Sequence, residues 1–297
     1  MTGTPLFTGV CTAMITPFRG GQIDYPALDG LLERQISAKV DALLIAGTTG
    51  EPSTLSDAEW ESLTAHALTR IAGRVRVIVG TGSNNLRVTL RRARFAADHG
   101  ADAQLCVTPY YNKTTQAGLV AHFTAMAEAG GIPVIMYNVP SRTGLNIAPE
   151  TALELSKHPL INGIKEASGN ISQVAKIAQL CGDELNIYSG NDDQVVPLLA
   201  LGGKGVISVV SNVKPELVHN CCKAFFDGDT AKARELQLEM LPLADALFCE
   251  VNPIPVKYAM NVLGWEAGEC RLPLVEPSEA HKEYIEKALR AEGLITE

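Results

Sequence analysis

Short apolar runs alternate with longer amphipathic segments along most of the chain. Within each run the apolar residues are nearly consecutive, which is typical of strands that are buried on both faces of a parallel sheet. The runs are Val10–Ile15, Ala42–Ala46, Val75–Val79, Ala103–Val107, Pro133–Met136, Ile161–Ile164, Leu185–Ile187 and Val206–Val210. We therefore expect eight parallel strands.

The segments between these runs carry apolar residues at helical spacing. Clear examples are Leu28–Ala38, Asp57–Ile71 and Leu86–His99. The second of these follows Ser56, and Glu59 comes three residues later, which is the capping-box pattern of a helix start. The sequence thus predicts a helix after each strand.

Repeated strand-then-helix units predict an α/β fold, a (β/α)8 TIM barrel over residues 1–226. A doubly wound open sheet is the alternative, and the number of units and the lack of a glycine-rich first turn favour the barrel. Beyond residue 226 the strand pattern stops. Residues 227–297 are predicted to form a C-terminal helical region, because Thr230–Glu250, Pro255–Leu263 and Glu279–Ala291 are helical in pattern.

Composition narrows the possible partners and compartments. The chain has 297 residues, 46% hydrophobic and 20% charged, as in ordinary globular proteins. A net charge of −8 without a basic run argues against nucleic acid and anionic membranes as partners. We expect a cytoplasmic protein, because the cysteines form no CxxC pair and the start of the chain lacks signal-peptide features. No apolar stretch is long enough to predict a membrane span.

Polar residues directly follow several of the predicted strands. In a barrel of this type the catalytic groups lie at the carboxyl ends of the strands. Clusters that are far apart in sequence are therefore expected to converge at one end. The clusters are Gly47–Glu51, Thr108–Asn112, Tyr137–Gly144 and Lys165–Gly169.

Lys165 closes a predicted buried strand and is the strongest chemical signal in the chain. A desolvated lysine amine loses its proton readily and can attack a carbonyl carbon to form a Schiff base. Two other interpretations are that Lys165 extends to solvent or forms a structural ion pair with Glu166. The polar clusters on the neighbouring loops favour the Schiff-base interpretation.

Three hydroxyl side chains are expected near this lysine. Tyr137 ends the adjacent predicted strand, and Thr48 and Tyr111 follow two others. A chain of hydroxyl groups can pass protons to and from a reacting centre. Tyrosine is also common as a packed aromatic whose hydroxyl bonds to backbone. Of the neighbours Tyr110 and Tyr111, only one is expected to face the site.

Two features suit the binding of carboxylates. The turn Gly47–Gly50 offers backbone N–H groups together with the hydroxyls of Thr48 and Thr49. We expect Arg142 to lie in a loop bracketed by a proline and a glycine, where its guanidinium could make paired hydrogen bonds. Alternatively, Gly47–Gly50 is an ordinary βα turn, and Arg142 forms an ion pair on the surface.

Several other kinds of site are disfavoured. The six histidines form no HxH or HxxxH pair, so no catalytic metal is expected. Gly80–Asn85 does not match the GxGxxG pattern of dinucleotide sites. Gly202–Gly205 precedes the eighth predicted strand and so lies at the amino end of the strands, whereas catalytic residues lie at their carboxyl ends. We expect no bound cofactor.

A set of motifs across nearly the whole chain resembles the dihydrodipicolinate synthase family of pyruvate-dependent class I aldolases. Each motif alone is shared with other pyruvate aldolases, whereas the combination is specific. The motifs are Gly47–Glu51, Thr108–Asn112, Tyr137–Gly144, Gly163–Ala167, Gly205–Val209 and Asn252–Lys257. The resemblance implies a cytosolic homotetramer that acts in lysine and diaminopimelate biosynthesis.

The resemblance also implies how pyruvate is bound. Lys165 would form a Schiff base with pyruvate, and this covalent imine would take the place of a cofactor. Thr49 and the backbone of Thr48 and Thr49 would hold the pyruvate carboxylate. The backbone of Ile207 would line the same pocket.

By the same resemblance, Tyr137 would move protons during imine formation through Thr48 to Tyr111. In this family the residue at the position of Tyr111 reaches the active site of a neighbouring subunit. Arg142 would bind the carboxylate of the second substrate, L-aspartate-4-semialdehyde. The enamine would attack the aldehyde, and transimination by the substrate's own amine would free Lys165. The product would be 4-hydroxy-tetrahydrodipicolinate.

One departure from the family pattern concerns feedback inhibition. Inhibited members bind lysine at a subunit interface through His, Glu, Asn and Tyr side chains. The matching positions here are Ser53, Asp57, Trp60, Asn84, Val88 and Tyr110. Trp60 and Val88 replace the His and the Glu, and a valine cannot pair with an ammonium group. The resemblance therefore predicts weak or absent inhibition by lysine.

Two alternative functions remain open at this point. An N-acetylneuraminate lyase or a 2-keto-3-deoxy sugar-acid aldolase would share Lys165 and Tyr137 but would need a polyol site. A catalytically silent barrel could bind 2-oxo acids as a sensor or scaffold. Arg142 and the Thr48–Thr49 pair favour a short acid semialdehyde as the second substrate.

Overall fold

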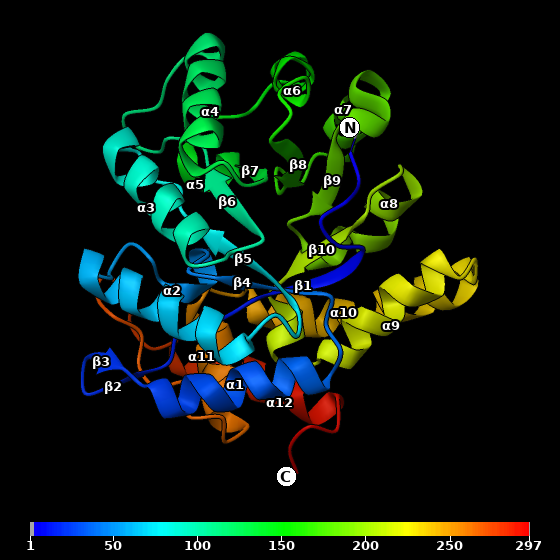
Figure 1. Cartoon of the computed structure of the whole chain (residues 1–297). Coiled ribbons are helices and arrows are strands. Elements are labelled where there is room, and N and C mark those ends of the chain that lie inside the picture. The colour runs from blue at the N-terminus through cyan, green and yellow to red at the C-terminus, as the bar shows by residue number, and fades with distance from the viewer. Residues whose placement is uncertain (1–2, 297) are drawn as a thin grey trace.

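The computed structural model describes residues 3–296 and contains a closed barrel of parallel strands (Figure 1). Around the barrel the strands neighbour one another in the order β1 (Gly9–Ala13), β10 (Gly205–Ser208), β9 (Asn186–Ser189), β8 (Ile161–Glu166), β7 (Val134–Asn138), β6 (Ala103–Val107), β5 (Arg76–Gly80) and β4 (Ala42–Ile45). The last of these pairs with β1 and closes the barrel. The predicted barrel is confirmed, and the open sheet is excluded.

Helices surround the strands and alternate with them along the chain (Figure 1). The surrounding helices are α1 (Tyr25–Ser37), α2 (Asp57–Ile71), α3 (Leu86–Asp98), α4 (Gln116–Gly130), α6 (Pro149–Ser156), α7 (Ile171–Cys181), α8 (Val195–Ala200) and α9 (Pro215–Phe226). Short helical turns occur between them at η1 (Thr48–Gly50), α5 (Pro140–Thr143), η2 (Gly182–Glu184), η3 (Asp192–Gln194) and η4 (Val210–Asn212). The turns η1, α5, η3 and η4 come within a few residues after strands β4, β7, β9 and β10. They therefore lie at the carboxyl end of the barrel.

The capping box predicted for α2 is present. The hydroxyl of Ser56 accepts a hydrogen bond from the backbone N–H of Glu59 at 3.3 Å. In return, the Glu59 carboxylate accepts one from the backbone N–H of Ser56 at 2.8 Å. Two N–H groups that a helix start leaves unpaired are thereby satisfied.

The segment between β1 and α1 differs in two details from the sequence-based prediction. Helix α1 begins at Tyr25, earlier than Leu28, because the Asp24 carboxylate caps its first turn. A small antiparallel hairpin, β2 (Phe18–Arg19) and β3 (Gln22–Ile23), precedes it. Strands of two residues are too short to produce a visible alternation of apolar and polar positions.

Apolar side chains fill the interior of the barrel. Near its amino end, the ring of Phe7, just before β1, stacks on Tyr188 with the centroids 4.4 Å apart. The Tyr188 hydroxyl donates a hydrogen bond to the carbonyl of Phe7 at 3.1 Å. Both side chains of this aromatic pair are buried in the barrel interior.

The C-terminal part of the chain is helical, with α10 (Thr230–Leu247), α11 (Ile254–Val262) and α12 (Glu279–Ala291). Helix α10 packs against α9, as Figure 1 also shows. It ends at Leu247, before the predicted Glu250. Buried side chains of all three helices belong to the same apolar cluster as those of the neighbouring barrel helices. The domain boundary at residue 226 therefore stays a prediction.

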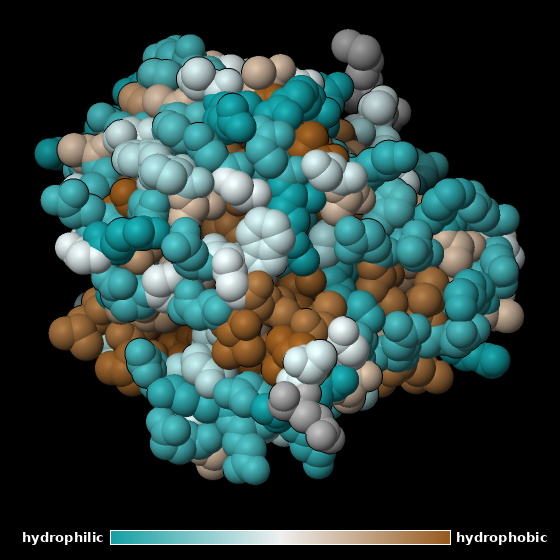
Figure 2. Space-filling model, turned by 90° about the horizontal axis from the view of Figure 1, so that it is seen from below, coloured by the Kyte–Doolittle hydropathy of each residue, from teal (hydrophilic) through white to brown (hydrophobic). Residues whose placement is uncertain are grey.

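The surface is largely hydrophilic, with apolar residues gathered in a band on the face that Figure 2 shows from below. Leu272 is the most exposed aliphatic side chain of the described residues at 79%. Within residues 3–296, none of the helices combines the length and apolar character that crossing a bilayer requires.

Candidate active site

Lys165 and Tyr137 lie side by side inside the barrel. Strands β7 and β8 pair in parallel with Tyr137 opposite Lys165. The Lys165 Nζ lies 4.4 Å from the centroid of the Tyr137 ring. Only 5% of Lys165 is exposed, so the amine is largely withdrawn from water. The sequence-based expectation that these two residues meet agrees with this geometry.

Glu166 does not pair with Lys165. Successive side chains of a strand point to opposite faces, and the Glu166 carboxylate bonds to groups on the other side of the sheet. It accepts hydrogen bonds from Asn138 Nδ2 at 2.9 Å, Gln173 Nε2 at 3.1 Å and the Ser168 N–H at 2.7 Å. The structural ion pair is therefore excluded, and burial excludes the solvent-extended lysine.

Asp192 is a second buried charged group near the amine. One of its oxygens, Oδ2, accepts hydrogen bonds from the N–H groups of Val209 and Val210 at 2.9 and 3.1 Å. Burial raises the pKa of this carboxyl, whereas its hydrogen bonds and the positive charge of Lys165 act in the opposite direction. Asp192 is not among the predicted site residues, although it closely follows the seventh predicted strand.

The turn η1 presents donors suited to a carboxylate. Its own hydrogen bond, from the N–H of Gly50 to the carbonyl of Gly47, measures 2.8 Å. Thr48 and Thr49 are its first residues, so their N–H groups have no acceptor within the turn. The Thr49 hydroxyl accepts from Asn252 Nδ2 at 3.0 Å and keeps its own hydrogen to donate.

Arg142 lies in the single helical turn α5 and not in the predicted loop. Its Nη2 donates to the backbone carbonyl of Asn252 at 3.2 Å. Arg142 and Thr48 line one cavity of about 550 Å³, together with Glu51 and Asn252. The structure thus brings these groups to a common cavity, of which buried Lys165 is not a lining residue.

Tyr111 is separate from this group in the single chain. Its side chain is 92% exposed, and its φ of 67° is in the left-handed region. Tyr110 lines the 550 Å³ cavity instead. Ile207 lies on β10 opposite Cys11 of β1, and both side chains are buried in the barrel interior.

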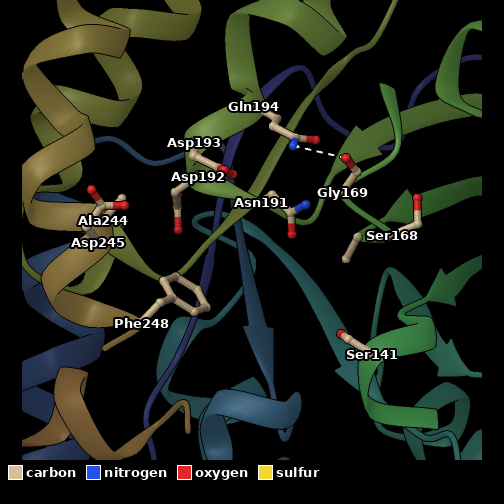
Figure 3. Close-up of a pocket in the computed structure, with 11 residues that line it drawn as sticks. Ser141, Ser168, Gly169, Asn191, Asp192, Asp193, Gln194, Ala244, Asp245 and Phe248 are labelled. Carbon is tan, nitrogen blue, oxygen red and sulfur yellow. Dashed lines mark hydrogen bonds between the residues drawn. The ribbon is translucent and has the colours of Figure 1, made fainter. Parts of the chain in front are cut away.

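A second cavity, of about 330 Å³, is lined mainly by polar residues that lie between Ser141 and Phe248 along the chain (Figure 3). Figure 3 shows Asp192, Asp193 and Asp245 on one side, with Ser168 and Ser141 on the other. Burial raises the pKa of Asp193. Within residues 3–296, no three His, Cys, Asp or Glu side chains are placed to hold a metal ion.

Gly190 lies beside the stem of the buried lysine and beside Ala167, which lines the second cavity. A Cβ at this position would lie 3.1 Å from Lys165 Cε and 2.5 Å from Ala167 Cβ. The absence of a side chain at Gly190 therefore leaves room for the stem of the lysine.

Comparison with known proteins agrees with the resemblance noted from the motifs. The family model described as the dihydrodipicolinate synthetase family matches residues 6–292. The 4-hydroxy-tetrahydrodipicolinate synthase of Caldicellulosiruptor saccharolyticus is 52% identical over 291 residues, which cover 98% of each chain. The enzyme of that name from Clostridium perfringens is 49% identical over 290 residues, covering 98% of this chain and 100% of its own.

Solved structures agree with the sequence comparison. The dihydrodipicolinate synthase of Thermotoga maritima superposes with a TM-score of 0.95 at 42% identity, covering 98% of this chain and 100% of the other. The one from Aquifex aeolicus gives a TM-score of 0.95 at 41% identity, with coverages of 97% and 99%. The chain therefore belongs to the dihydrodipicolinate synthetase family.

Proposed function

We propose that Lys165 is the residue that carries pyruvate as a Schiff base in this chain. The reaction is the condensation of pyruvate with L-aspartate-4-semialdehyde to 4-hydroxy-tetrahydrodipicolinate, a step of lysine and diaminopimelate biosynthesis. One observation carries the assignment of the residue: a buried amine whose Nζ lies 4.4 Å from the centre of the Tyr137 ring. A withdrawn amine beside a phenol suits imine formation.

The proposed chemistry gives each of these groups one role. The Lys165 Nζ attacks the ketone carbon of pyruvate, and loss of water leaves the imine. Thr49 and the N–H groups of η1 hold the carboxylate, while the Tyr137 hydroxyl gives and takes protons. Loss of a proton from the methyl group gives the enamine, whose carbon attacks the aldehyde. The second substrate's amine then displaces Lys165 from the imine and closes the ring.

Trapping of the imine tests this proposal. Borohydride added in the presence of pyruvate would reduce the C=N bond and fix the three-carbon acid on Lys165. Mass spectrometry of the digested protein is expected to find the added mass on the peptide that contains Lys165. A chain that is not labelled there would favour the silent 2-oxo-acid-binding barrel. Cleavage of sugar acids without condensation would favour the sugar-acid aldolase.

Replacement of Arg142 with alanine is expected to weaken use of the semialdehyde. We assign Arg142 to the carboxylate of that substrate, because it lines the same cavity as Thr48. Loss of charge-assisted hydrogen bonds, each contributing about 1.5–3 kcal/mol, predicts a fall in kcat/KM for the semialdehyde of about 100-fold. Steady-state kinetics with each substrate varied in turn would measure it. An unchanged KM for the semialdehyde would contradict the assignment.

Weak or absent inhibition by lysine is a further expectation. The Trp60 N–H is committed to the carbonyl of Gly80 at 3.2 Å, and its ring is fully buried with the Arg92 guanidinium 5.0 Å from its centroid. Val88 lines the 550 Å³ cavity and offers no charge. Turnover is therefore expected to stay constant in millimolar lysine, and inhibition at micromolar lysine would contradict this.

We also propose a homotetramer in which Tyr111 completes the hydroxyl relay of a neighbouring subunit through Thr48. The 92% exposure of Tyr111 in the single chain and the exposed Leu272 support a further contact. Light scattering would give four chain masses. Mixing the Tyr111→Phe and Lys165→Ala variants would restore part of the activity if the residue acts in a partner's site.

The remaining proposals concern cofactor and compartment. We propose that the covalent imine on Lys165 is the only group that the reaction needs, and that activity survives treatment with a chelator. We place the chain in the cytoplasm, which the absence of disulfides among its seven cysteines supports.

A further inference from the structure

A buried ion pair joins the C-terminal region to the turn η1. Lys257 on α11 donates from Nζ to Glu51 Oε1 at 2.9 Å, and the two side chains are 1% and 0% exposed. The same amine donates to the carbonyl of Thr16 at 3.0 Å and to that of Glu269 at 2.6 Å. All three hydrogens of the ammonium group therefore have acceptors.

Glu51 is the residue at which η1 ends. Its N–H donates to the carbonyl of Thr48 at 3.1 Å, and its φ of 55° turns the chain away from the helix. The second carboxylate oxygen accepts from the N–H of Arg271 at 2.9 Å. The position of this carboxylate therefore sets where the end of the turn lies.

Asn252 lies five residues before Lys257 and makes a second connection to the site. Its side-chain amide donates to the Thr49 hydroxyl, and its carbonyl accepts from Arg142. The segment Asn252–Lys257 thus contacts Thr49, Glu51 and Arg142. These contacts link the turn assigned to the pyruvate carboxylate with the guanidinium assigned to the second substrate.

We propose that Lys257 and Glu51 are positioning residues, whose ion pair fixes the turn η1 relative to Arg142. The proposal rests on the proposed roles of Thr49 and Arg142. A buried charge pair is a costly way to hold a fold together, since apolar side chains of similar volume often serve as well. A fully hydrogen-bonded pair fixes direction and distance more closely than apolar packing does. An accurate position of η1 relative to Arg142 would matter most for the binding of the two substrates.

The first test is Lys257→Met, which keeps most of the stem and removes the amine. We expect KM for pyruvate to rise about tenfold, with kcat changed far less, because displacement of the turn weakens binding before and during the reaction alike. The concentration of pyruvate that gives half-maximal borohydride labelling of Lys165 should rise in parallel. Lys232→Met is the matched control, because Lys232 forms an exposed pair with Glu235.

Two further variants separate positioning from stability. Glu51→Gln combined with Lys257→Met removes both charges, so that no unpaired charge is buried. Glu51→Asp keeps both charges and shortens one side chain. Thermal unfolding would identify the folded variants, and kinetics would be measured well below each midpoint. Folded variants with a raised KM for pyruvate support the proposal.

A parent-like KM in either folded variant would overturn the proposal and leave the pair a purely structural role. Failure of all three variants to fold would also overturn it, because the pair would then be required by the whole fold. Failure of the proposed function differs, since the parent chain itself would take up no label on Lys165.

Discussion

Alanine at position 165 is expected to lower kcat by a factor on the order of 10⁴ to 10⁶, the scale seen when an enzyme loses its nucleophile. Without the amine, pyruvate cannot form the imine, and the only other buried lysine among the described residues, Lys257, is held in its ion pair with Glu51. The same variant should take up no label from pyruvate and borohydride. Turnover with both substrates and mass spectrometry would measure the two effects.

The control for this variant is Lys176→Ala on α7, which removes an exposed lysine. It should keep the parent's turnover and its labelling at Lys165. Circular dichroism would show whether the Lys165→Ala barrel is folded, because the position is 95% buried and truncation leaves space inside. A folded Lys165→Ala chain with kcat within tenfold of the parent would overturn the mechanism.

Phenylalanine at position 137 is expected to reduce kcat by about 10² to 10⁴-fold, the usual contribution of a positioned acid or base. The ring that lies 4.4 Å from the Lys165 Nζ is kept, so the packing around the amine should survive. Only the hydroxyl that we assign to proton transfer is lost. Stopped-flow measurement of imine formation would locate the slowed step.

Tyr284→Phe on α12 provides a matched control, because that tyrosine is 41% exposed and lies far along the chain from the barrel strands. It should leave kcat unchanged. If Tyr137→Phe formed the imine at the parent's rate, the hydroxyl would have no part in proton transfer.

The barrel was predictable because its strands are buried on both faces, and such strands appear in sequence as apolar runs. The capping box of α2 was predictable because its contacts are local. The hairpin β2–β3 was not predicted, because strands of two residues are too short to show a periodic pattern. The start of α1 was missed by three residues because a cap at Asp24, rather than an apolar position, defines it.

Within the site, the pairing of Lys165 with Tyr137 followed from both residues lying at the ends of predicted neighbouring strands. The contacts of Asn252 did not follow, since it lies 203 residues from Thr49 along the chain. Lys257 was noted only as the end of a motif. Burial of both charges of its pair with Glu51 depends on packing between remote segments, which no local pattern records.

The stacked rings of Phe7 and Tyr188 affect how substrates and product reach and leave the site. With the amino end of the barrel occupied, both substrates must enter, and water and product must leave, past the same rim. Product that has not yet departed therefore blocks the next pyruvate. Accumulating product should therefore slow the enzyme by competing with pyruvate, its first substrate.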